Sequence, residues 1–203
     1  KVGTPPINTN DQKQLIKKHK DFIFFTTPGF FIGNLINFIF LALFIDYYGN
    51  HFGGQIAASV QYLGISIAII SSSFSQVYFK EITKIKTKKE LRSTYTYWFI
   101  RLGVLGLIGS IGLQFIPDSL IVFFLGEKWS GLIDIMQIMA LWMAVMFISS
   151  SLSYIYIKLG KQKQTLILDI IHLLMVLIGM GWVHESFKSP MTTLWFFTII
   201  QLL

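Results

Sequence analysis

The stretch FIFFTTPGFFIGNLINFIFLALFI, residues 22–45, carries no charged side chain over 24 positions. The hydrocarbon core of a bilayer is about 30 Å thick, so about 20 apolar residues in a helix cross it. A strand of a membrane β-barrel has only about ten residues, and its polarity alternates. The stretch is too long and too uniformly apolar for such a strand, so it predicts a transmembrane helix.

The same pattern repeats along the chain. Four further complete apolar runs follow, at 55–79, 93–116, 132–157 and 164–183. A sixth run begins at Pro190 and is still apolar where the chain stops at Leu203. We predict an all-α, polytopic transmembrane bundle with five complete spans and a truncated sixth. Because the sixth run is cut and the chain starts on Lys1 without a signal peptide, we expect a piece of a longer protein.

The composition agrees with a membrane protein. The 203 residues are 53% hydrophobic and only 13% charged, with 19 Phe, which is more apolar surface than one soluble core of this size buries. There is no Cys, no His pair at ligand spacing, and no GxSxG, HExxH, Walker or paired-carboxylate motif. We therefore expect no metal, no cofactor and no enzymatic activity.

The basic residues orient the predicted spans. Five Lys precede the first span, six bases lie between the second and third, and three lie between the fourth and fifth. These 14 of the 17 Lys and Arg fall on one side of the predicted topology. Short cytoplasmic loops retain Lys and Arg, so the N-terminus is predicted to be cytoplasmic, and no nucleic-acid partner is expected. Within the predicted cytoplasmic segment 1–21, residues 11–20 fit a short interfacial helix.

Polar side chains interrupt the first two spans. The first carries Thr26, Gly29, Gly33 and Asn37 at steps of three and four residues, which places them on one face of a helix, and Asn34 adjoins that face. Such a face either packs closely against another helix or lines a water-filled cavity. The second span carries polar residues at helical spacing, Gln76 among them, and this stripe has the same two interpretations.

Two charged residues lie inside predicted spans, Arg101 in the third and Asp169 in the fifth. A charge at membrane depth is costly unless it is paired or reaches water. The two positions differ in predicted depth by about 4 to 5 Å, so we predict an Arg101–Asp169 ion pair or a shared cytoplasm-facing cavity. His172, one turn beyond Asp169, either relays protons or hydrogen-bonds between helices. Arg101, Asp169 and His172 are therefore the ion-pair or proton-coupling candidates.

Several short motifs resemble, in order, the C-terminal lobe of the bacterial polysaccharide flippases. They are TTPG at 26–29, YYG at 47–49, SSFSQVYF at 72–79, FFLGEKW at 123–129 ahead of a run with Gln137, and KLGKQK at 158–163. The family is that of the Wzx-type O-antigen and exopolysaccharide translocases, in the multidrug/oligosaccharidyl-lipid/polysaccharide exporter superfamily. The resemblance covers nearly the whole chain, with residues 22–203 as one lobe and 1–21 as the linker to the other.

The resemblance implies a MATE-like transporter of two lobes that rock around a central cavity in the bacterial inner membrane. Its expected substrate is an undecaprenyl-pyrophosphate-linked oligosaccharide, moved from the cytoplasmic to the outer leaflet for polysaccharide biosynthesis. On this resemblance Arg101 would meet the pyrophosphate. The amides that would bind sugar hydroxyls are Asn34, Asn37, Gln61 and Gln76, and with Arg101 they are the candidates for the substrate cavity. The implied partners are membrane lipid, the N-terminal lobe, a polysaccharide polymerase and glycosyltransferases. One Arg is few for such an anion, so the other lobe would supply further cations.

Other functions remain open from the sequence. In a MATE-type drug or cation antiporter, Asp169 and His172 would couple export to Na⁺ or H⁺. The chain would alternatively be a non-transporting membrane scaffold of a capsule-synthesis complex. A membrane acyltransferase or glycosyltransferase is the least favoured alternative, because no loop carries a catalytic His/Asp or metal-binding carboxylate motif.

Overall fold

The computed structural model describes residues 22–202, which are helical throughout apart from short connections. No strand occurs in this part of the chain, so the predicted all-α fold is confirmed there. The predicted segment 1–21, with its interfacial helix, lies outside the described residues. The elements are η1 (Phe22–Thr26), α2 (Thr27–Lys84), α3 (Lys88–Gln114), α4 (Asp118–Leu125), η2 (Glu127–Trp129), α5 (Leu132–Leu152), α6 (Tyr154–Lys158), α7 (Gln162–Phe187) and α8 (Pro190–Ile200).

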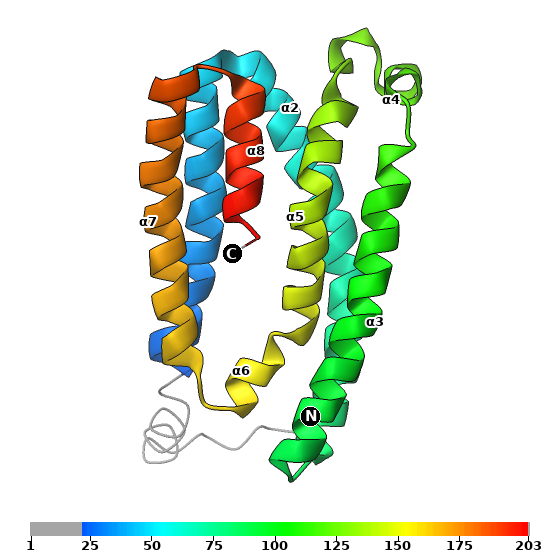
Figure 1. Cartoon of the computed structure of the whole chain (residues 1–203), viewed down its shortest axis with the longest axis vertical. Coiled ribbons are helices and arrows are strands. Elements are labelled where there is room, and N and C mark those ends of the chain that lie inside the picture. Colours follow the sequence, from blue (N-terminus) through cyan, green and yellow to red (C-terminus); the bar gives the residue numbers. More distant parts are fainter. Residues whose placement is uncertain (1–21, 203) are drawn as a thin grey trace, which may run out of the picture.

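The first two predicted spans lie in η1 and α2, and α2 turns back at Gly49 between them. Gly49 has φ +84° and ψ 172°, a backbone conformation that only glycine adopts without strain. We call residues 27–48 the first arm of α2 and residues 50–84 its second arm. Figure 1 shows the first arm rising in blue and the second descending in cyan and teal. A glycine thus closes the hairpin between two apolar arms.

Within residues 22–202, four helical stretches are long and apolar enough to cross a membrane. They are Phe22–Lys84, which holds both arms of α2, Lys88–Gln114, Glu127–Lys158 and Gln162–Phe187. Helix α8, with 11 residues, is shorter than a span. These helices indicate a membrane protein, while five complete spans and a truncated sixth remain a prediction.

The predicted fourth span, 132–157, is not one regular helix in the structure. Helix α5 ends at Leu152 and α6 begins at Tyr154, and Figure 1 shows α6 turned away from the axis of α5. Around the break, the hydroxyls of Ser149, Ser151 and Ser153 donate to backbone carbonyls three or four residues earlier. Such bonds compete with the helical ladder and bend it. The apolar pattern alone does not reveal this bend.

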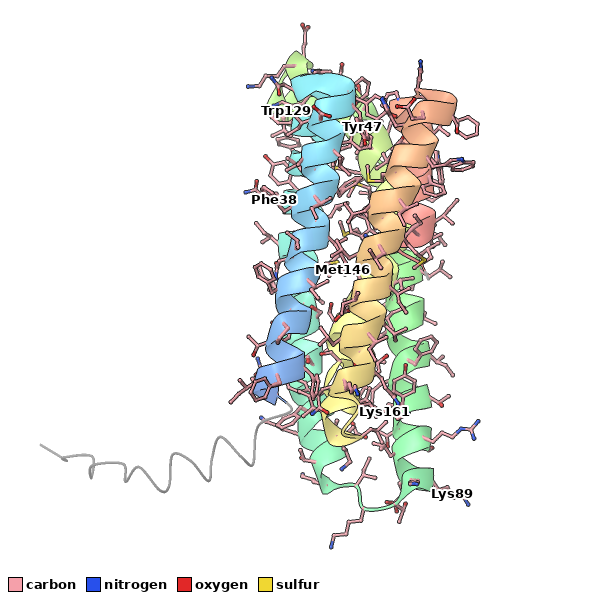
Figure 2. The ribbon with its side chains drawn as sticks, turned by 90° about the vertical axis from the view of Figure 1, so that its left-hand side faces the viewer. Phe38, Tyr47, Lys89, Trp129, Met146 and Lys161 are labelled. Atoms are coloured by element: carbon pink, nitrogen blue, oxygen red, sulfur yellow. The ribbon has the colours of Figure 1, made fainter. Side chains whose placement is uncertain are left out.

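Helix α5 is the centre of the bundle, since it packs against α2, α3 and α8. Its Met139 and Trp142 join a buried cluster with Phe40 of the first arm and Phe197 of α8. Phe40 and Phe197 stack with ring centroids 3.6 Å apart. In contrast, Phe38 is 69% exposed and points outward in Figure 2. Outward-facing aromatic rings of this kind suit contact with lipid.

The two ends of the bundle differ in charge and in aromatic content. Figure 2 shows Lys89 and Lys161 at one end, which we call the basic end, and Tyr47 and Trp129 at the other. The basic loops therefore gather at one end, as the predicted topology requires. At the opposite end, the Tyr48 hydroxyl lies 2.6 Å from Thr193 Oγ1, so the turn of α2 is tied to α8.

We predict that Gln137→Ala destabilises the protein by about 1 to 3 kcal/mol, because the Gln137 amide closes the end of α3. Its Nε2 donates to the carbonyls of Leu113 (3.3 Å), Gln114 (3.4 Å) and Ile116 (3.2 Å). The matched control is Gln114→Ala, whose amide donates only to the Gln137 carbonyl, at 3.0 Å. Thermal unfolding in detergent measures both. Equal losses of stability would show that Gln137 has no capping role.

Candidate functional site

A cavity of about 560 Å³, with polar side chains among largely apolar walls, lies at the basic end of the bundle. Its walls come from η1, the first arm of α2, the α5–α6 break and the start of α7, with one residue from the second arm. The polar residues that line it are Thr26, Asn34, Asn37, Ser75, Ser153, Tyr154, Tyr156, Gln162, Thr165 and Asp169. Most of these lie on helices whose other faces are apolar, so the cavity concentrates polar groups where lipid cannot hydrogen-bond them.

The first arm contributes Asn34 and Asn37 to the wall of this cavity. Pro28 occupies the first turn of α2, where its missing N–H costs no helical bond. The Asn34 amide donates to the Phe30 carbonyl at 2.7 Å, and the Asn37 amide to the Gly33 carbonyl at 3.2 Å. Both side chains are held along the helix, and neither amide oxygen has a donor among residues 22–202. These oxygens are therefore free to accept from a ligand or water.

Asp169 is the single charged side chain among the described residues that line the cavity. It is half-buried, and no hydrogen bond or salt bridge joins it to another residue between 22 and 202. A Cβ added at Gly29 would lie 2.8 Å from Asp169 Oδ2. The absence of a side chain at Gly29 thus lets the Asp169 carboxylate approach the start of α2.

Two further polar atoms from the elements that carry this site, η1 and α7, are buried without a partner in the described part of the chain. They are Thr26 Oγ1, from a residue that lines the cavity, and His172 Nε2, one turn beyond Asp169 on α7. His172 does not itself line the cavity. Buried groups of this kind usually have a hydrogen-bond partner, so both are notable exceptions.

The structure does not bring Arg101 and Asp169 together. Arg101 lies on α3, where its guanidinium sits 4.0 Å from the centre of the Tyr97 ring and its side chain is exposed. Asp169 lies on α7, which packs against η1, α2, α6 and α8, and Figure 1 shows α3 and α7 on opposite sides of the bundle. The predicted ion pair is absent, and Arg101 is not in the cavity, because similar depth does not fix the direction that each helix faces.

The second arm contributes less than the sequence suggested. Gln61 and Gln76 are both exposed, and neither lines the cavity. Ser75 does so instead. A helix turns by about 100° per residue, so neighbouring positions face different surroundings, and the polar stripe could not be placed to one residue.

Sequence reasoning missed the residues that close the cavity near the α6–α7 turn. Ser153 and Tyr154 line it because α5 breaks there, and Gln162 lies at the first turn of α7. Among the residues near this turn, Thr165 could be predicted to line the cavity, because it precedes Asp169 by one helical turn and shares its face.

This arrangement offers amides, hydroxyls and one carboxylate, and no cationic side chain among the described lining residues. Such groups suit a neutral polyhydroxyl ligand or a cation better than a phosphate. These side chains, together with the volume of the cavity, support the binding of a polar ligand. A comparison of the chain with protein-family models, with curated proteins and with solved structures finds no match.

Proposed function

We propose that the chain is part of a membrane transporter of the polysaccharide-flippase type, which carries a lipid-linked oligosaccharide across the bacterial inner membrane. The observation that carries this proposal is the cavity lined by Asn34, Asn37 and Asp169 within a bundle of apolar helices. Amides and carboxylates are the side chains that bind sugar hydroxyls, and lipid tails cannot satisfy them. The order of short motifs given above supports the same class.

In this proposal the basic end faces the cytoplasm, as the distribution of Lys and Arg favours. The cavity then opens toward the leaflet where a lipid-linked saccharide is assembled. Because no cation lines it among the described residues, the sugar would bind here and the pyrophosphate elsewhere. The second lobe expected from the resemblance is the proposed source of the phosphate-binding cations.

The Asn34→Ala/Asn37→Ala double variant is expected to lower polysaccharide export by about tenfold, from the loss of two hydrogen bonds to the sugar. The assay is the recovery of surface polysaccharide when the intact gene is expressed in a translocase-deficient strain, with membrane levels measured alongside.

The matched control is Gln61→Ala/Gln76→Ala, which removes two exposed amides that lie outside the cavity. The control is expected to retain export. Equal export by both double variants, at equal membrane levels, would exclude the cavity as the sugar site and favour the non-transporting scaffold.

A second candidate function is cation-coupled export of the MATE type. The observation that favours it is Asp169, the one charged group in the cavity, which has no partner among residues 22–202. Thr26 Oγ1, also without a partner there, adds an oxygen that could serve a bound cation. The transported molecule distinguishes the candidates, since an antiporter of this type would export a drug or organic cation instead of a saccharide.

A further inference from the structure

A second cavity at the basic end adjoins the first at Tyr156 and is lined by cationic side chains. It has a volume of about 380 Å³ and lies between the start of α3 and the α6–α7 turn. Lys88 and Arg92 line it from α3, and Lys161 from the turn. The proposed transport function assigns no role to these residues.

Local structure fixes where these three bases lie. Lys88, Arg92 and Tyr95 follow at helical spacing and share one face of α3, whose first turn is capped by Thr87 accepting from the Glu90 N–H at 3.3 Å. Lys161 follows Gly160, whose φ is +65°, and its N–H donates to the Tyr156 carbonyl at 2.9 Å. The backbone on both sides of the cavity is therefore held by hydrogen bonds.

No acidic side chain in the described wall of this cavity balances the positive charge of its three bases. No Asp or Glu is among its described lining residues. Glu90 lies between Lys88 and Arg92 in the sequence and so faces another direction, and Glu81 accepts from Trp98 Nε1 at 2.7 Å. The N-terminus of α3 adds the positive end of its helix dipole. The cavity therefore favours an anion.

The floor of the cavity is apolar. Leu91 and Ile155 are both buried and belong to one cluster of packed side chains, and Leu159 lies exposed beside them. Tyr95 and Trp98 lie in the second and third turns of α3, and aromatic residues near a helix end are typical of the boundary between headgroups and hydrocarbon. A ligand that fits both the basic side chains and the apolar floor of the cavity carries a phosphate at one end and hydrocarbon at the other.

We propose that this cavity binds an anionic phospholipid of the leaflet at the basic end, with its phosphodiester between Lys88, Arg92 and Lys161 and its acyl chains along Ile155 and Leu159. Basic cavities between transmembrane helices on the cytoplasmic side are suited to such headgroups. The proposal depends on membrane insertion and not on the transported substrate.

The test is native mass spectrometry of the full chain in mild detergent with palmitoyl-oleoyl phosphatidylglycerol, and with phosphatidylcholine of the same acyl chains. The unmodified protein is expected to retain phosphatidylglycerol preferentially. The Lys88→Gln/Arg92→Gln/Lys161→Gln variant is expected to bind it about a hundredfold more weakly, since each base near a lipid headgroup contributes about fivefold. Arg92→Gln alone, at an exposed position, is expected to lose about fivefold and serves if the triple variant misfolds.

The matched control is Lys80→Gln/Lys84→Gln/Lys86→Gln, which removes the same charge from exposed positions of the same end, outside the cavity. It is expected to retain the preference for phosphatidylglycerol. Equal losses in both triple variants would overturn the proposal in favour of diffuse attraction to the whole basic end. Displacement of the lipid by millimolar inorganic phosphate would overturn it in favour of a phosphate-ion site.

Discussion

Gly29→Ala is expected to lower transport by about tenfold or more, because its new methyl group would displace the carboxylate of Asp169. The Cβ would lie 2.8 Å from Asp169 Oδ2, closer than such atoms normally approach. Asp169 is the single charged group among the described lining residues of the cavity, so its displacement alters the field at the site. The measurement is export of surface polysaccharide by the intact protein, normalised to its level in the membrane.

The matched control is Gly33→Ala, one turn further along the same helix and also in the cavity wall. No atom lies within 4 Å of a Cβ added there, so this variant is expected to keep its activity. Asp169→Asn is expected to lose at least as much activity as Gly29→Ala, and the double variant no more than Asp169→Asn alone. If the fold loss of transport in the double variant equals the product of the two single fold losses, Gly29 acts independently of Asp169.

A comparison of the unmodified protein with Asp169→Asn also distinguishes the two candidate functions. If Asp169 couples export to a cation gradient, collapse of the Na⁺ or H⁺ gradient should reduce transport by the unmodified protein and leave the residual transport of Asp169→Asn unchanged. If Asp169 only binds sugar, both proteins should respond to the collapse in the same proportion.

Gly49→Ala is expected to destabilise the protein by about 1 to 3 kcal/mol, the cost of forcing a side chain into the conformation that Gly49 adopts. The cost comes from the backbone alone, since no neighbouring atom lies within 4 Å of a Cβ added there. Thermal unfolding in detergent, followed by the loss of helical circular dichroism, measures the change.

Gly54→Ala provides the control, because Gly54 also has open space around its Cβ but lies within the helical part of the second arm. There Ala is expected to be neutral or more stable by up to about 1 kcal/mol. Equal melting temperatures for the two variants would show that the reversal in α2 does not depend on the conformation of Gly49.

The sequence predicted that the chain is helical better than it predicted which helices pack against one another. Long apolar runs can satisfy their backbone only as helices, so the all-α fold followed from composition and length. The break at Ser153 was missed because serine hydroxyls that donate to the backbone leave no mark on an apolar pattern. Gly49 was identifiable only as part of a short turn, and its positive φ depends on the path of both arms.

In the candidate site, too, the sequence identified the polar residues but not the direction in which each of them faces. Asn34, Asn37 and Asp169 stood out as polar residues in apolar runs, and all three line one cavity. Arg101 stood out for the same reason, yet it lies on α3 beside Tyr97. Depth along a helix can be counted from the sequence, but the direction that a side chain faces depends on which helices pack together. That packing is a property of tertiary structure.

The central place of α5 has a consequence for the order of assembly during synthesis. Away from the loop that joins them, α2 and α3 are held together mainly through α5, which follows both in the chain. Helices can enter a membrane singly and associate afterwards. Helices α2 and α3, which are synthesised first, would therefore remain loosely associated in lipid. The bundle would become compact only when α5 inserts between them.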